Sequence, residues 1–133
     1  MFFFDQIDFL TTFAFLGWIE KNKADELFEP QIAGLTLKCL SECVPSCVPG
    51  IVFLSGGQTE KEAAERLCAI NMIAKELGKR KVPWLLSFSY GRALQNSAVD
   101  AWKGEDNNLE EAQKKFIAQA EKCSKAVRGA LKD

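Results

Sequence analysis

Two short segments of this 133-residue chain share one pattern, in which an apolar strand ends in a hydroxyl group and glycine. They are Phe53-Leu54-Ser55-Gly56-Gly57-Gln58 and Phe88-Ser89-Tyr90-Gly91-Arg92-Ala93-Leu94-Gln95. Each leads into a segment with helical periodicity. Glycine lets the backbone approach an anion closely, and the N–H groups of a helix start point toward it. Arg92 adds a planar, permanently charged group that suits phosphate oxygens. Two such loops on neighbouring strands predict one phosphate pocket.

Strands and amphipathic helices alternate along the chain, which predicts an α/β fold with parallel βα units. The helix that follows the first glycine loop begins with a capping box, Thr59 and Glu62. Asn108 and Glu111 predict the same device at the last helix, with a buried stripe through Leu109, Phe116 and Cys123. We expect strands near 51–55 and 82–89, and helices near 59–77, 91–102 and 108–129.

The short helix after Gly91 separates this order from that of a plain doubly wound sheet. In eightfold barrels, phosphate commonly lies on the loops after the last two strands, beside a short extra helix. The order from residue 51 onward matches that arrangement. The element order therefore favours barrel-type βα units over a plain doubly wound sheet.

Residues 1–30 differ in character from the rest and end at Pro30. Their start is strongly apolar, but Asp5 and Asp8 stand where a signal peptide would carry positive charge. The uninterrupted apolar part, 9–19, is too short to span a membrane. We expect an additional apolar helical segment that is buried or faces a partner, and a weak membrane association stays open.

The charge and the cysteines limit the partners. The net charge of −1 provides no positive field for nucleic acid. Five cysteines without a secretory context favour free thiols in a reducing compartment, and we expect a cytoplasmic protein. The even spacing of Cys39, Cys43 and Cys47 fits no zinc or iron–sulfur pattern, and the chain has no histidine. We expect small buried thiols there and no metal.

Leu54-Ser55-Gly56-Gly57-Gln58 is identical to the signature of ABC-type ATPases. Such an ATPase also needs a phosphate loop of the form GxxxxGK[ST] and an acidic strand end for magnesium, and the chain contains neither. The ATPase interpretation is therefore disfavoured.

From about residue 36 to residue 129, the chain resembles the C-terminal part of class I fructose-bisphosphate aldolase. The resemblance is carried by ordered blocks of sequence. They are Val48-Pro49-Gly50-Ile51-Val52-Phe53-Leu54-Ser55-Gly56-Gly57-Gln58, Ala69-Ile70-Asn71, Pro83-Trp84, Phe88-Ser89-Tyr90-Gly91-Arg92-Ala93-Leu94-Gln95, Ala101-Trp102 and Asn108-Leu109.

This resemblance implies a fragment of a (β/α)8 TIM barrel, made of its last two βα units, within residues 31–133. The two glycine motifs would end the seventh and eighth barrel strands and hold a phosphate of a phosphorylated sugar. That sugar would be fructose 1,6-bisphosphate or dihydroxyacetone phosphate, in the reversible aldol cleavage of glycolysis, without a cofactor or metal. Ser55 would donate its hydroxyl, and Gly56 and Gly57 their backbone N–H groups. Ser89 and Gly91 would form the second wall, and Arg92 would pair with the phosphate charge.

Aldolases of this class act through a lysine that forms a Schiff base, and in the family that lysine lies upstream of the part that is matched here. Residues 1–35 do not resemble the family, and Lys21 and Lys23 lie in a polar stretch typical of a solvated surface. A reactive lysine requires a desolvated or positively charged surrounding. We therefore assign no catalytic residue and expect this chain alone to be inactive.

Three interpretations follow from the resemblance. The chain is a truncated aldolase, a non-catalytic phosphate-binding or interaction module, or one half of a two-chain aldolase whose other half supplies the lysine. Two strands leave sheet edges and one face unpaired, so self-association into a homo-oligomer is a further expectation.

Overall fold

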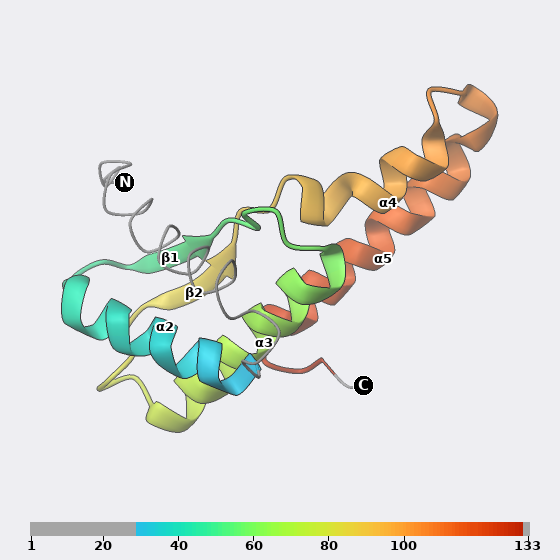
Figure 1. Ribbon diagram of the computed structural model, residues 1–133. Coiled ribbons are helices and arrows are strands. Elements are labelled where there is room, and N and C mark those ends of the chain that lie inside the picture. Colours follow the sequence, from blue (N-terminus) through green and yellow to red (C-terminus); the bar gives the residue numbers. More distant parts are fainter. Residues whose placement is uncertain (1–28, 132–133) are drawn as a thin grey trace.

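A two-stranded parallel sheet, covered by helices, forms the centre of the computed structural model (Figure 1). The structure describes residues 29–131, so the predicted N-terminal helical segment lies outside the described residues except at its end. The elements follow in the order α2 (Glu29–Cys43), β1 (Gly50–Phe53), α3 (Glu60–Leu77), β2 (Leu85–Phe88), α4 (Arg92–Trp102), the 3-10 turn η1 (Asp106–Asn108) and α5 (Leu109–Val127). The α/β class with parallel βα units is confirmed.

The sheet pairs β1 with β2 in parallel, and α3 makes the crossover between them. The register joins Gly50 to Leu85 and Phe53 to Phe88. Ile51, Phe53 and Leu86 face the helices and are buried, as the period of two predicts. Val52, Leu54 and Leu85 lie on the opposite face and are exposed, with 69% of Leu85 accessible. One face of the sheet therefore belongs to the core, and the other presents exposed apolar side chains.

Helix α2 begins at Glu29, so Pro30 lies inside its first turn and does not precede the helix. Proline is tolerated there because the first N–H groups of a helix have no partner within it. The helix buries Ala33, Leu37 and Leu40 against the core. The expectation that Cys39, Cys43 and Cys47 are buried is wrong, because Cys39 lies beside the buried stripe and the other two thiols are exposed. All five cysteines are free.

Helix α3 confirms the predicted start. The Thr59 hydroxyl accepts a hydrogen bond from the Glu62 N–H at 3.2 Å, and a Glu62 carboxylate oxygen accepts from the Thr59 N–H at 2.8 Å. The same carboxylate oxygen also accepts a hydrogen bond from the Thr59 hydroxyl at 2.7 Å, and the bonds from the Thr59 N–H and hydroxyl lower the pKa of the Glu62 carboxyl group. The predicted apolar stripe is buried at Ala63, Leu67 and Ile70, whereas Leu77 at the end of the helix is exposed.

Helices α4 and α5 lie against each other and form an arm that extends away from the sheet (Figure 1). The α5 cap prediction is wrong: the side chain of Asn108 makes no cap bond, and its amide donates to the Trp102 carbonyl at 3.2 Å. The predicted stripe is buried at Ala112 and Cys123, but Leu109 and Phe116 are exposed because they lie on the arm beyond the core. Within residues 29–131, the helices are too short or too polar to cross a bilayer.

Candidate functional site

The two glycine loops begin at the same end of the sheet, where both strands have their carboxyl ends (Figure 1). Because β1 and β2 are parallel, their carboxyl ends lie side by side. The Ser89 N–H donates to the Phe53 carbonyl at 2.8 Å, which carries the pairing one residue past the end of β2. The structure thus brings the segment 55–57 and the segment 89–92, which are distant in sequence, to one edge.

The first loop is a tight turn. The Ser55 carbonyl accepts a hydrogen bond from the Gln58 N–H at 2.8 Å, and Ser55 itself is only 8% exposed. Gly56 and Gly57 have φ angles of 50° and 94°, in the left-handed region that favours glycine. A Cβ atom built on Gly57 would meet no atom within 4 Å. The side of the loop at Gly57 therefore has room for a further group.

The second loop leads directly into α4. Gly91 precedes the first residue of the helix, and no side chain caps its N–H groups. A Cβ atom on Gly91 would also meet nothing within 4 Å. Arg92 is the first helical residue and is exposed, as is Ser89. Among residues 29–131, the Arg92 side chain has no hydrogen-bond or ion-pair partner, so its charge is available to an anion.

Tyr90 fastens the second loop to the start of α3, a role that sequence reasoning did not assign. Its hydroxyl donates to the Ala63 carbonyl at 2.9 Å, and its ring lies 5.1 Å from that of Phe88. Burial raises the pKa of the Tyr90 phenol, so the hydroxyl keeps its proton and stays a donor. The only sequence signal was the place of Tyr90 between Ser89 and Gly91, within the quoted motif.

A further contact joins the starts of α3 and α4. The Glu60 carboxylate accepts a hydrogen bond from the Ser97 N–H at 2.8 Å. Glu60 is the first residue of α3, and Ser97 lies in the second turn of α4. The two helix starts therefore form one unit with the two loops. Together they offer glycine N–H groups, two hydroxyls, two helix N-termini and one guanidinium, a set suited to a phosphate group.

The nucleophile for Schiff-base chemistry is a lysine, and neither glycine loop contains one. The described lysines lie on helices or at the turns near 79–81 and 103. Lys21 and Lys23 lie outside the described residues. The loops can thus bind an anion but do not themselves supply a nucleophilic amine.

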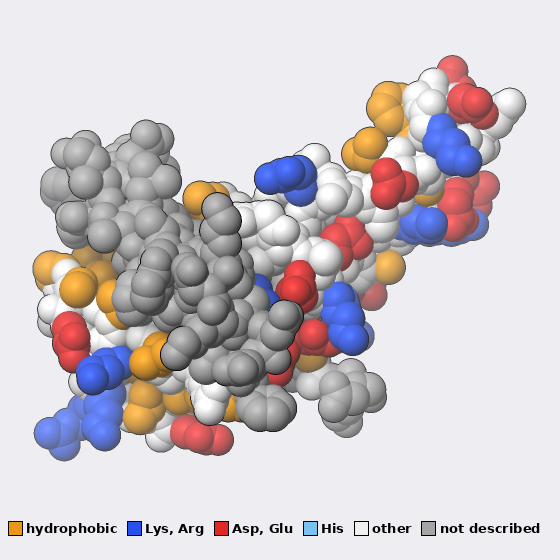
Figure 2. Space-filling model, in the orientation of Figure 1, with side chains coloured by type: hydrophobic (Ala, Val, Ile, Leu, Met, Phe, Trp, Pro, Cys, Tyr) orange, Lys and Arg blue, Asp and Glu red, His pale blue; other side chains and the backbone are white. Residues whose placement is uncertain are grey.

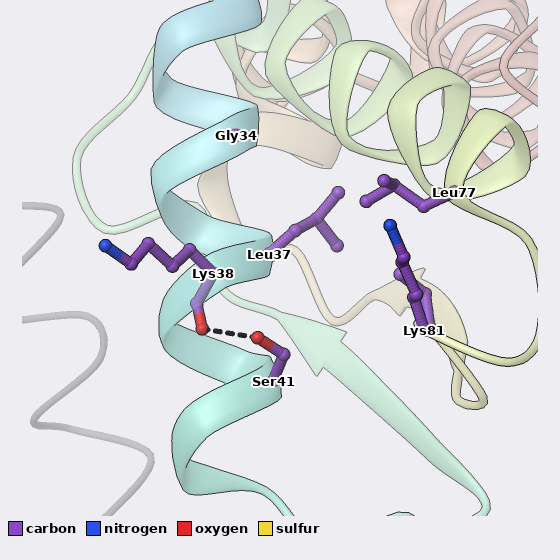
Figure 3. Close-up of a pocket in the computed structure, with 7 residues that line it drawn as sticks. Gly34, Leu37, Lys38, Ser41, Leu77 and Lys81 are labelled. Carbon is purple, nitrogen blue, oxygen red and sulfur yellow. Dashed lines mark hydrogen bonds between the residues drawn. The ribbon is translucent and has the colours of Figure 1, made fainter.

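A separate hollow of about 370 Å³ lies between α2 and the end of α3, near the start of β2 (Figure 3). Its lining is mostly apolar, with Leu37 and Leu77 pointing toward each other. The Lys81 amine points toward Leu77, whereas Lys38 extends to the other side of α2. This hollow does not include any residue of the two glycine loops, so it is distinct from the predicted phosphate pocket.

Comparison with known proteins gives a consistent result. Residues 19–133 match the family model described as "Glycolytic: Fructose-bisphosphate aldolase class-I". The expectation that residues 1–35 do not resemble the family is therefore wrong for residues 19–35, which the model also matches. Fructose-bisphosphate aldolase 4, cytosolic, of Arabidopsis thaliana is 50% identical over 101 residues, which are 76% of this chain and 24% of that protein. Fructose-bisphosphate aldolase C of Pan troglodytes is 48% identical over 99 residues, 74% of this chain and 26% of that protein.

A solved structure of fructose-bisphosphate aldolase from Plasmodium falciparum, in complex with TRAP and a small-molecule inhibitor, superposes with a TM-score of 0.74 at 39% identity. The superposition covers 81% of this chain and 29% of that one. The chain therefore spans about a quarter of the length of the relatives that it matches.

Proposed function

Because the chain belongs to the class I fructose-bisphosphate aldolase family, we propose that it provides the phosphate-binding part of that enzyme. In this proposal its strands are the last two of a (β/α)8 barrel, and a phosphate group of the sugar lies between the two glycine loops. The whole enzyme cleaves fructose 1,6-bisphosphate reversibly into dihydroxyacetone phosphate and glyceraldehyde 3-phosphate. The names of the plant relatives and the five free cysteines support a cytosolic location.

One observation carries the proposal. The parallel register of β1 and β2, extended by the bond from the Ser89 N–H to the Phe53 carbonyl, puts both loops at one edge. A Cβ atom built on Gly57 or Gly91 would meet nothing within 4 Å, which leaves room for a ligand beside both loops. Ser55, Gly56 and Gly57 form one wall in this proposal, Ser89 and Gly91 form the other, and Arg92 balances the phosphate charge.

The proposal separates binding from catalysis. The sequence provides no convincing Schiff-base lysine, so we expect the 133-residue polypeptide to bind a phosphorylated sugar without cleaving it. Measurable cleavage of fructose 1,6-bisphosphate by this polypeptide, purified from a host that lacks its own aldolase, would contradict the second half of the statement.

The binding half is tested by titrating the ¹⁵N-labelled chain with dihydroxyacetone phosphate and following the amide signals of Gly56, Gly57 and Gly91. Arg92→Gln should raise the dissociation constant about tenfold, because a charge-assisted bond to the phosphate is lost. Arg80→Gln is the matched control. It removes the same charge from the turn before β2, at the opposite end of the sheet from the two glycine loops. Equal affinities in the two variants would contradict the assignment of Arg92.

The open face of the sheet favours a second candidate function, in which the chain complements a separate N-terminal aldolase half that carries the lysine. Val52, Leu54 and Leu85 are exposed on that face, and the described sheet has only two strands. Apolar strands that are unpaired at an edge favour a covering partner. Co-expression with the missing barrel portion should yield a stable complex with aldolase activity, and intact mass spectrometry of the native polypeptide should then find a separate chain of 14.8 kDa. A single native polypeptide of aldolase length would contradict this candidate.

A further inference from the structure

We infer that Gln119, in the middle of α5, is a positioning residue that holds the two helix starts of the proposed phosphate site at a fixed spacing. Its amide nitrogen donates to the Glu60 carbonyl at 3.1 Å and to the Ala93 carbonyl at 2.9 Å. Glu60 begins α3, and Ala93 is the second residue of α4. One side chain from a third helix therefore joins the two helices that follow the glycine loops. The inference rests on the proposed function.

The amide group of Gln119 suits this role chemically. A glutamine NH₂ group carries two N–H donors, and here each has a carbonyl acceptor. Gln119 is 7% exposed and lies on the same buried stripe as Ala112, Cys123 and Ala126. A polar side chain in such a stripe costs stability unless its hydrogen bonds are made. The two bonds therefore account for a glutamine where the helix pattern would favour an apolar residue.

The direction of the two bonds determines what they leave free. Helix carbonyls point toward the C-terminus and helix N–H groups toward the N-terminus. Gln119 bonds to carbonyl groups in the first turns of α3 and α4, on the side away from the helix N-termini. The first N–H groups of both helices therefore remain directed at the two loops. The contact thus sets the position of the helix ends without occupying the place of the anion.

The neighbouring contacts act together with Gln119. The Ser97 N–H is the donor that regular helix geometry pairs with the Ala93 carbonyl, and it donates to the Glu60 carboxylate at 2.8 Å. Gln119 supplies the Ala93 carbonyl with a donor from α5. Residues Glu60, Ala93, Ser97 and Gln119 thereby form a closed set of hydrogen bonds between three helices. A change at Gln119 is expected to reach both loops at once.

The test compares Gln119→Met with Asn71→Leu in the full chain. Methionine has nearly the length of glutamine and no N–H donor. Asn71 is a matched control, because it is 8% exposed and its amide donates to the Leu67 carbonyl at 3.0 Å within α3. Both variants lose a buried amide bond, so both are expected to unfold at a lower urea concentration than the wild type. Of these two side chains, Gln119 bonds to both helix starts, whereas Asn71 bonds only within α3.

Inorganic phosphate is the probe, titrated into each ¹⁵N-labelled variant at fixed ionic strength. We expect Gln119→Met to raise the dissociation constant about tenfold and Asn71→Leu to leave it within about twofold of the wild type. Equal affinities in the two variants, at similar losses of stability, would overturn the inference and leave the phosphate site intact. A wild type without any phosphate binding would contradict the proposed function.

Amide hydrogen exchange without ligand decides the role of Gln119 independently of binding. Gln119→Met should speed exchange in the first two turns of both α3 and α4, at Ala64 and Ser97 among others. Asn71→Leu should speed exchange around its own turn of α3 only. An effect of Gln119→Met that is confined to α5 would show that the two helix starts keep their positions without it, which contradicts the inference.

Discussion

The Tyr90 hydroxyl donates a hydrogen bond to the Ala63 carbonyl at 2.9 Å, across 27 residues of sequence. Tyr90 belongs to the loop after β2, and Ala63 lies in the first turn of α3, which follows the loop after β1. The bond therefore ties one glycine loop to the helix that leaves the other. Its strength should appear both in stability and in the behaviour of the loops.

Removing this hydroxyl should destabilise the protein. Tyr90→Phe keeps the ring contact with Phe88 but leaves the Ala63 carbonyl without its side-chain donor. We expect a loss of about 1 kcal/mol in the free energy of unfolding, measured by urea denaturation. The amide signals of Ser89 and Gly91 should also shift, whereas those of α2 should not. An unchanged unfolding midpoint would show that the bond contributes nothing to stability.

The same residue predicts a dependence on alkaline pH. Burial raises the pKa of the Tyr90 phenol in the folded protein above its value in the unfolded chain. The folded state therefore favours the protonated phenol, and this contribution is present below about pH 10 and is lost as the pH rises through the folded pKa. Tyr90 is the only tyrosine, so phenolate absorbance reports it directly. Tyr90→Phe should lack this part of the alkaline loss, and a phenol that titrates near pH 10 in the native protein would contradict the prediction.

The capping box of α3 predicts a loss of stability in acid. Bonds from the Thr59 N–H and hydroxyl lower the pKa of Glu62 in the folded protein. The carboxylate therefore stabilises the fold above its unfolded pKa of about 4.3, and this contribution disappears as the pH falls through the folded pKa. Glu62→Gln should flatten this part of the pH profile. Thr59→Ala should cost about 1 kcal/mol at neutral pH, measured by urea denaturation. A profile that is identical for Glu62→Gln and the wild type would contradict the assignment.

Two glycines predict opposite effects of the same substitution. Gly57 has a φ angle of 94°, where an L side chain is strained, so Gly57→Ala should destabilise the protein by about 1 kcal/mol despite the free space around it. Gly34 lies within α2, and a Cβ atom there meets nothing within 4 Å. Gly34→Ala should therefore stabilise the protein by about 0.5–1 kcal/mol. Thermal unfolding of both variants checks the pair, and a shift of the same sign in both would contradict the explanation.

The exposed apolar face of the sheet predicts that the chain self-associates. A charge introduced on that face should prevent the association. Leu85 projects from β2 with 69% of its surface accessible, on the same face of the sheet as the exposed Val52 of β1. Leu85→Lys should shift the sedimentation coefficient toward that of the monomer and leave the unfolding midpoint nearly unchanged. Ile117→Lys is the control on the α4–α5 arm, where Figure 2 shows charged and hydrophobic side chains together. If Ile117→Lys dissociates the oligomer and Leu85→Lys does not, the contact lies on the arm.

Local signals made α3 and the two loops predictable. Thr59 and Glu62 lie three residues apart and satisfy each other's backbone and side chains, so the start of the helix depends on no distant residue. The left-handed φ angles at Gly56 and Gly57 likewise belong to the sequence of the turn itself. The pairing of the two strands followed from the βα order.

The parts that escaped prediction depend on contacts between distant elements. Gln119 is buried because carbonyls of α3 and α4 accept its two N–H groups, which no helical period in α5 reveals. Leu109 and Phe116 fit the apolar stripe of α5, yet the arm carries them past the core. Asn108 resembles a cap residue, but its side-chain amide donates a hydrogen bond to the Trp102 carbonyl instead. In each case tertiary geometry outweighed the local pattern.

The hydrogen bonds described above that join the two loops and their helices lie between Phe53 and Gln119. A gene fusion or exon transfer that carried this one contiguous stretch would transfer the residues of these hydrogen bonds together. A site whose binding residues are spread over a whole sequence would be divided by such a transfer. The unit around β1 and β2 is therefore a natural candidate for grafting onto an unrelated scaffold.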